Sequence, residues 1–272
     1  MNRKIINKTV FISIAKCIIK ITYTKKTKVI HFLKDFIVSR PTSYDYLIKF
    51  ASNIGVLVNN DKDQQKNSII LPHEINRYAF QYFVRNVLQD FLGKNKSGFF
   101  LHCSGVLMGN KAYLFLGPQS SGKSTISRML SGVAQKLVDD SGIIIKENKN
   151  FYLYQTPFIE KRSFVKSYKG YLIDKIFFIS KSKKFMDEVI IRNLRKTEAL
   201  DLFIKQLWTD KKRLNIQLKI AMQFVNDFTQ FYKLDFPKNK IAVNNWFVRF
   251  SSSPISNCVP AHLRQNNYEV HP

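Results

Sequence analysis

The stretch LFLGPQSSGKST, residues 114–125, has the residue types and spacing of a phosphate-binding loop. It fits the pattern GxxxxGK[ST], with glycine at the two positions where backbone must turn sharply or lie against a phosphate. In such a loop, successive backbone amides point at the β-phosphate, the lysine bridges the β- and γ-phosphates, and the serine hydroxyl binds Mg²⁺. The residues expected to contact a nucleotide are Gly117, Ser120, Ser121, Gly122, Lys123, Ser124 and Thr125. The alternative is a turn rich in glycine and serine that binds no ligand.

Two adjacent carboxylates, Asp139 and Asp140, follow sixteen residues after the lysine. A helix over residues 123–132 would carry the chain about 15 Å from the loop, and four or five extended residues at roughly 3.3 Å each would return it. The pair is therefore expected beside the loop. There, one carboxylate could hold Mg²⁺ or its water shell while the other accepts the proton of an attacking hydroxyl. A solvated DDSG turn is the alternative.

A histidine is the third candidate. Gly109 and Asn110 suit a two-residue hairpin turn between apolar runs, and counting back from it places His102 opposite Gly117. An imidazole at that position could bind an anionic group or orient a catalytic carboxylate. A hydrogen-bonded core histidine is an equally good interpretation of the sequence.

The elements that must position these residues alternate between strands and helices. The sequence predicts strands over residues 10–21, 29–33, 54–58, 98–108, 111–117, 135–140, 142–147, 150–155, 171–180 and 187–194. A helix is expected from Glu74, with apolar residues at 75, 79, 83, 87 and 91 and an end at Gly93. Further helices are expected over 125–130, 197–208 and 214–231. The end of the chain, with Pro237, Pro254 and Pro260, is expected to be irregular.

This order of elements predicts an α/β protein. The expected organisation is a β-rich N-terminal region over residues 1–72, a P-loop core with a mixed sheet over 73–250, and an irregular tail over 251–272.

Composition limits the classes of protein further. The formal net charge is +25, with 44 Lys and Arg against 19 Asp and Glu, but the basic residues are scattered in short runs and lack the pattern of an RNA-binding sheet. A nucleic-acid partner is therefore not expected.

Cys17, Cys103 and Cys258 cannot all pair, and lysines interrupt the apolar N-terminal segment well before it could span a membrane. Both features indicate a cytoplasmic protein without a transmembrane segment.

The run FLHCSGVLMGNKAYLFLGPQSSGKST followed by KLVDDSG resembles the HPr kinase/phosphorylase family and its looser HPr-kinase-like relatives, a P-loop group akin to phosphoenolpyruvate carboxykinase. The shared pattern is a strand with His102 and Ser104, a hairpin, the P-loop and the Asp-Asp pair. The close match spans residues 99–142. A weaker likeness extends over most of residues 70–236.

This resemblance implies ATP-dependent phosphorylation of a hydroxyl. Asp139 matches the family's general base, Asp140 and Ser124 would lie near Mg²⁺, and His102 would support the acidic pair. The family's Glu-x-Arg-Gly element is replaced by YQTPFIEKRSF, which removes the basis for assigning HPr as the substrate or for a phosphorylase reaction. Lys161 and Arg162 either supply positive charge to the site or lie on the surface. The family includes hexamers, whereas its looser relatives need not assemble. The resemblance therefore allows an oligomer but does not require one.

The expected activity is a Mg²⁺-ATP-dependent kinase that acts on a hydroxyl of a protein or small molecule, with Asp139, His102 and Lys123 as catalytic residues. The sequence does not indicate the acceptor. Two alternatives remain: a nucleotide-binding module or ATPase whose ATP state regulates a partner, for example in peptide modification, and a basic nucleic-acid-binding ATPase. The Asn-Lys-x-Asp element of GTP-specific proteins is absent from the sequence.

Overall fold

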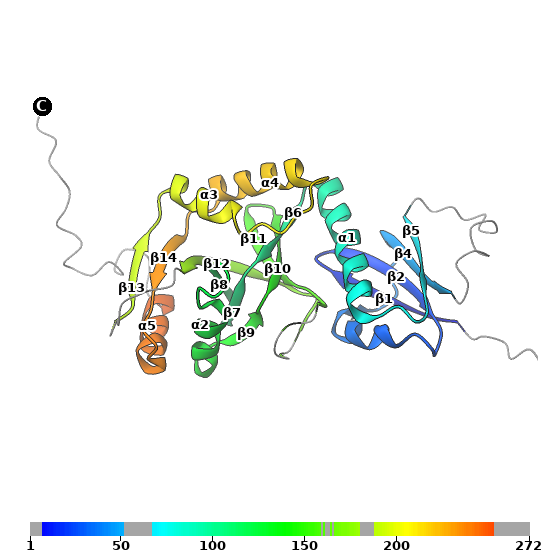
Figure 1. Ribbon diagram of the computed structural model, residues 1–272, viewed down its shortest axis with the longest axis horizontal. Helices are drawn as coiled ribbons and strands as arrows, with labels where there is room; N and C mark the ends of the chain where they lie inside the picture. The colour runs from blue at the N-terminus through cyan, green and yellow to red at the C-terminus, as the bar shows by residue number, and fades with distance from the viewer. Residues whose placement is uncertain are drawn as a thin grey trace, which may run out of the picture.

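The computed structural model describes residues 7–51, 67–158, 160, 164, 166–179 and 188–252. Within them, the protein has a five-stranded sheet at the N-terminal end and a larger nine-stranded sheet, with helix α1 (Arg77–Asn95) between the two (Figure 1). Both sheets combine parallel and antiparallel pairs. The predicted α/β class with a mixed sheet is confirmed.

The N-terminal sheet has the strand order β3-β1-β2-β4-β5. Its strands are β1 (Lys8–Ile14), β2 (Cys17–Tyr23), β3 (Ile37–Val38), β4 (Tyr46–Ala51) and β5 (Ser68–Pro72). The predicted single strand over 10–21 is wrong: it is a hairpin that turns at Ala15 and Lys16, both with positive φ. No glycine or asparagine marks this turn in the sequence.

The predicted strand over 29–33 is also wrong, because it lies in a 3₁₀ helix, η1 (Lys28–Phe36). The residues that it buries are Val29, Ile30, Leu33 and Phe36, whose spacing of three and four is typical of a helix. The predicted strand over 54–58 lies outside the described residues.

Helix α1 begins at a side-chain cap, since the Ala79 amide donates to Asn76 Oδ1 at 2.9 Å. Its buried face consists mainly of Phe80, Val84, Val87, Leu88 and Leu92. The predicted apolar face is therefore shifted by one residue, and Phe83 is 36% exposed. The helix also continues through Gly93 and ends at Lys96, which adopts the left-handed conformation. The helix has two apolar stripes, and the one that contains Phe80, Val84 and Leu88 is buried between the sheets.

The larger sheet has the order β6-β10-β11-β12-β8-β7-β9, and β14 joins β12 and β13 at its edge. Its strands are β6 (Gly98–His102), β7 (Ser104–Met108), β8 (Lys111–Leu116), β9 (Gln135–Val138), β10 (Ser141–Glu147), β11 (Asn150–Gln155), β12 (Gly170–Ile179), β13 (Ile190–Asn193) and β14 (Phe231–Asp235). Eight of these nine strands overlap predicted segments. The exception is β14.

This sheet curls because two chain segments change partners part-way along. The first segment breaks at Cys103, so that β6 pairs with β10 while β7 pairs with β8 and β9. The second breaks at residues 139–140, between β9 and β10. The two breaks lie together, since the Cys103 amide donates to the Asp140 carbonyl at 3.3 Å. They bring the histidine and the acidic pair to one point of the sheet.

Helices cover both faces of the larger sheet (Figure 1). One face is covered by α3 (Lys196–Ile204) and α4 (Leu214–Asp227), and the other by α2 (Lys123–Met129) and α5 (Lys240–Ser252). The predicted helix over 197–208 ends early, at Ile204. The predicted helix over 214–231 ends at Asp227, and β14 begins at Phe231. The segment after Pro237, which was expected to be irregular, forms α5. Residues 253–272 lie outside the described part of the chain.

Two of the three cysteines are described, and both have free, buried thiols. Cys17 lies in the N-terminal sheet and Cys103 in the larger one, and burial raises the pKa of each thiol. Cys258 falls outside the described residues. None of the described helices has an apolar stretch long enough to span a bilayer.

Candidate functional site

The loop predicted to bind phosphate connects the end of β8 to the start of α2. Its backbone has positive φ at Gly117, Ser120 and Gly122. A Cβ at Gly117 would lie 2.4 Å from the Ile179 carbonyl oxygen and 2.8 Å from Ser121 Oγ. Glycine is therefore required at position 117 by a close approach to the end of β12.

Lys123 folds back over the beginning of this loop. Its side chain is buried, and its Nζ donates to the carbonyl oxygens of Gly117 at 2.6 Å and Pro118 at 3.0 Å. Ser121 Oγ is buried without a hydrogen-bond partner among the described residues. A buried charge held by carbonyl groups beside an unpaired hydroxyl is an arrangement that suits a polar ligand.

The other predicted nucleotide contacts lie where the loop meets α2. Ser124 and Thr125 are half-buried in the first turn of the helix, while Ser120 is exposed. The Thr125 amide donates to the Gly122 carbonyl at 3.0 Å, so it belongs to the helix. Ser124 carries the hydroxyl at the position predicted to contact Mg²⁺.

The two adjacent carboxylates have different surroundings. Asp139 is 2% exposed, and its Oδ2 lies 2.8 Å from Lys136 Nζ. Its other oxygen, Oδ1, lies 3.5 Å from Ser104 Oγ, which is hydrogen-bonded to Ser127 of α2. Asp139 is thus packed against the loop helix through Ser104.

Asp140 is 47% exposed and lies beside the predicted histidine. Its Oδ1 is 3.4 Å from His102 Nδ1. His102 is anchored through its backbone amide, which donates to the Gln206 carbonyl at 2.9 Å. The pair is therefore accessible from solvent, unlike Asp139.

The predicted register of the hairpin is correct, but the predicted pairing of His102 with Gly117 is wrong. Met108 pairs with Lys111, and the ladder runs back to Ser104 opposite Phe115. The chain then breaks at Cys103, so His102 pairs with Ser141 of β10 instead of Gly117. His102 nevertheless lines one cavity together with Gly117.

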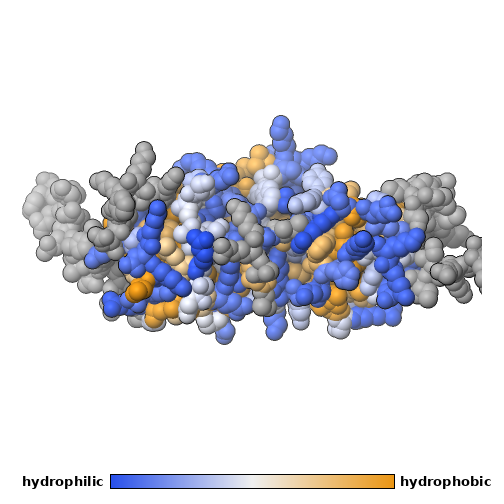
Figure 2. Space-filling view, turned by 60° about the horizontal axis from the view of Figure 1, so that its bottom comes forward, coloured by the Kyte–Doolittle hydropathy of each residue, from blue (hydrophilic) through white to orange (hydrophobic). Residues whose placement is uncertain are grey.

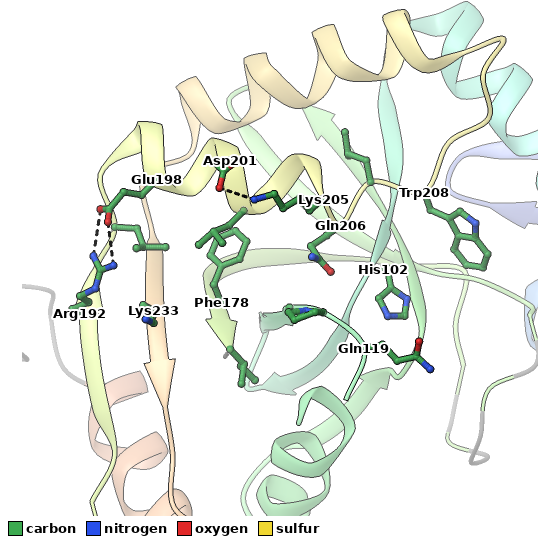
Figure 3. Close-up of a pocket in the computed structure, with 16 residues that line it drawn as sticks. His102, Gln119, Phe178, Arg192, Glu198, Asp201, Lys205, Gln206, Trp208 and Lys233 are labelled. Carbon is green, nitrogen blue, oxygen red and sulfur yellow. Dashed lines mark hydrogen bonds and ion pairs between the residues drawn. The ribbon is translucent and has the colours of Figure 1, made fainter. Parts of the chain in front are cut away.

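That cavity has a volume of about 840 Å³ and extends from the loop along the ends of β12, β13 and β14 (Figure 3). Its lining is mainly apolar, with Phe178, Leu202 and Trp208 among the contributing residues. A volume of this size fits a small molecule. Outside the loop, no sequence motif marks this space, because its other walls come from α3, the segment 206–208 and four strands.

Sequence reasoning also missed Glu160, which contacts the backbone of Asp139. The Asp139 amide donates to Glu160 Oε2 at 2.7 Å, and Lys166 Nζ lies 3.6 Å from Oε1. Burial raises the pKa of Glu160 to about 7, against the opposing effect of Lys166. The neighbouring Lys161 and Arg162, considered from the sequence, lie outside the described residues.

A second missed residue, Arg85, reaches the site from α1. Its guanidinium carbon lies 3.6 Å from the centre of the Trp208 ring and 5.1 Å from that of Phe158. Burial lowers the pKa of Arg85, and the charge of Asp140 opposes that shift. Arg85 precedes the loop by about thirty residues with no fixed spacing, so only the fold relates it to the site.

The donors present suit Mg²⁺ bound together with phosphate. The described residues contain no group of three His, Cys, Asp or Glu that could hold a metal ion alone. The Ser124 hydroxyl and the carboxylates of Asp139 and Asp140 are hard oxygen donors, and Mg²⁺ is commonly held by one or two such groups with phosphate and water. The donor set therefore fits an ion that arrives with a nucleotide.

Comparison with known proteins gives little further support. No protein-family model and no curated protein matches the sequence. Among solved structures, the HPr(Ser) kinase/phosphatase from Coxiella burnetii is similar over 56% of this chain and 98% of its own, with 12% identity and a TM-score of 0.29. A TM-score this low carries no inference about the function of the chain.

Proposed function

We propose that the protein transfers the γ-phosphate of ATP to a hydroxyl group, as a kinase of the HPr-kinase-like kind. The observation that carries the proposal is the position of Gly117. Its carbonyl accepts a hydrogen bond from Lys123 Nζ, and it lines the cavity that His102 also lines. The lysine that we expect to bind phosphate therefore contacts the wall of the cavity through Gly117, and the histidine that pairs with Asp140 lines the same cavity.

The different exposure of the two carboxylates changes the roles suggested by the sequence. A general base must reach the proton that it accepts. Asp140, with His102 beside it, is open to an acceptor, whereas Asp139 is enclosed by Lys136 and Ser104. We assign proton acceptance to the Asp140–His102 pair, and to Asp139 the positioning of α2 through Ser104 and Ser127.

Lys123 and the loop amides would bind the β- and γ-phosphates, and Ser124 would contribute a hydroxyl to Mg²⁺. When bound, Mg²⁺ neutralises charge on the phosphate oxygens. The acceptor oxygen would form a bond to the γ-phosphorus as the bond to the β–γ bridging oxygen breaks, and ADP would leave. The hydroxyl proton would pass to the Asp140–His102 pair.

The test separates nucleotide binding from transfer. Lys123→Ala should abolish ATP binding in calorimetry, because the variant lacks the charge that neutralises the phosphates. Asp140→Asn should bind ATP like the parent and lower transfer from γ-labelled ATP into a lysate and metabolite pool of the source organism by about a hundredfold or more. Asp139→Asn is the matched variant, and it should lower transfer less.

Unchanged ATP binding by Lys123→Ala would disprove the site. If Asp139→Asn lowers phosphoryl transfer more than Asp140→Asn does, the roles expected from the sequence hold instead. ATP binding by the parent with no transfer to any acceptor would favour a nucleotide-binding module that regulates a partner.

A further inference from the structure

The cavity lies beside the part of the loop where the γ-phosphate of a nucleotide would bind. In a loop of this type, amides at the helix end hold the α- and β-phosphates and the lysine reaches the β- and γ-phosphates. Lys123 Nζ lies on the carbonyls of Gly117 and Pro118, at the beginning of the loop. The γ-phosphate end is thus the Gly117 end, which is also the part of the loop that lines the cavity. This places the cavity on the acceptor side.

The charges in the cavity are mostly paired with one another. Arg192 is held by Glu198 through contacts of 3.1 and 3.3 Å, and Lys205 lies 2.8 Å from Asp201. Lys233 also lines the cavity, and no carboxylate pairs with it among the described residues. Lys233 therefore gives its end of the cavity a net positive charge.

Lys233 and His102 lie at opposite ends of this space, with Phe178 between them (Figure 3). Phe178 of β12 pairs in register with Lys233 of β14 on one side and with Leu116 of β8, the residue before the loop, on the other. His102 is the last residue of β6, and β7 begins two residues after it at Ser104. From β14 across β12 and β8 to β7 is three strand spacings, or about 14 Å. An occupant that contacts both ends must span a distance of this order.

We propose that the acceptor is a small hydroxyl compound with an apolar body and an anionic group, most simply a carboxylate, about 14 Å from the hydroxyl. The inference rests on the proposed kinase function. The anionic group binds Lys233, the body packs against Phe178, Leu202 and Trp208, and the hydroxyl lies at the Asp140–His102 pair. Its oxygen takes the γ-phosphoryl group, its proton passes to that pair, and ADP leaves.

The experiment uses 10-hydroxydecanoate, whose extended chain has a similar length, and 1,10-decanediol, which lacks the carboxylate. With Mg²⁺ and γ-labelled ATP, the parent should phosphorylate the acid with a KM at least about tenfold lower than that for the diol, as expected for a charge-assisted contact. Lys233→Met should remove this difference by raising the KM for the acid alone. Lys233→Glu should reverse the preference, making 10-amino-1-decanol a better acceptor than the acid.

Lys219→Gln, which neutralises an exposed lysine on α4 outside the cavity, is the control and should behave like the parent. ATP binding by each variant is measured separately in calorimetry.

If the parent binds ATP yet does not favour the acid over the diol, or if Lys233→Glu leaves the preference unchanged, the acceptor inference is wrong while the kinase proposal stands. If lysate proteins are labelled and none of the three compounds is, the acceptor is macromolecular and the inference is also wrong. If the parent does not bind ATP, the kinase proposal fails as well.

Discussion

At the scale of single residues, burial sets the protonation of Glu160, one of two buried acids beside the loop. Asp139 and Glu160 are each 2% exposed, and each has a lysine partner, Lys136 and Lys166 respectively. The partners differ in distance, 2.8 Å for Asp139 and 3.6 Å for Glu160, and Glu160 Oε1 has no hydrogen bond within the described structure. Desolvation therefore dominates at Glu160 and raises its pKa to about 7.

This shift predicts a pH dependence of stability. Because the pKa of Glu160 is higher in the folded chain than the ordinary 4.5, the folded state binds more protons between those two values. Its contribution to stability is therefore present at low pH and lost as the pH rises through this window. Glu160→Gln should remove up to about 3 kcal/mol of that loss between about pH 4.5 and 7.5. Urea unfolding of both proteins at several pH values measures the difference, and parallel pH profiles would contradict it.

Sequence reasoning could name the residues whose spacing is fixed by local geometry. The loop from Gly117 to Ser124 is contiguous, and one helix and one strand separate it from the acidic pair. Glu160, Arg85 and Lys233 could not be named, because their contacts depend on how the sheet curls and on where α1 packs. The exposures of Asp139 and Asp140 also depend on packing, so their adjacent positions in the sequence could not show which of the two is open to solvent.

At the scale of elements, the site depends on strand ends that approach one another closely. Gly117 at the end of β8 meets the carbonyl of Ile179 at the end of β12. These two strands are parallel neighbours, so their ends converge at the same edge of the sheet. Their contact sets the position of the loop.

Gly117→Ala should therefore displace the loop. Its Cβ would lie 2.4 Å from a backbone oxygen, which cannot move away as a side chain can. We expect a loss of about 1–3 kcal/mol of unfolding free energy and weaker ATP binding. Gly93→Ala is the control: no atom lies within 4 Å of its Cβ, and alanine in a helix should stabilise by about 0.5–1 kcal/mol. Denaturant unfolding and ATP calorimetry of both variants test this, and equal behaviour of the two would contradict it.

Elements were predictable where alternation and turn chemistry agreed. The Gly109-Asn110 hairpin and the strands β9 to β12 follow such patterns. The β1–β2 hairpin was missed because its turn residues, Ala15 and Lys16, carry no turn signal. Helix α5 was missed because the prolines around it suggested an irregular segment, although Val243, Phe247 and Phe250 supply a buried helical face.

At the scale of the whole molecule, the basic charge is spread out. Figure 2 shows hydrophilic residues distributed over the described part of one face, with apolar areas between them. The basic run at 25–28 leads into η1 of the N-terminal part, while that at 211–213 precedes α4. The run at 181–184 lies outside the described residues. That nucleic acid is not a partner therefore stays a prediction, which binding measurements at two salt concentrations can test.

The two sheets share one apolar cluster. Ile12, Ile14 and Ile48 of the N-terminal sheet belong to it together with Phe100 and Ile145 of the larger sheet and the buried face of α1. Polar contacts cross the same boundary, since Lys16 Nζ lies 2.7 Å from Glu147 Oε2. A boundary near residue 72, where the sequence suggested one, would therefore divide regions that are packed against each other.

From this shared cluster we predict that the sheets unfold together. Ile145→Ala, a change within the larger sheet, should cost about 2–5 kcal/mol and lower hydrogen-exchange protection by the same free energy in β2 and in β8. The shared loss follows because the cavity opens where both sheets meet. Ile241→Ala makes the same chemical change at a side chain that is 71% exposed and should leave both strands unaffected. Loss of protection in β8 with β2 unchanged would instead show that the N-terminal sheet folds as an independent unit.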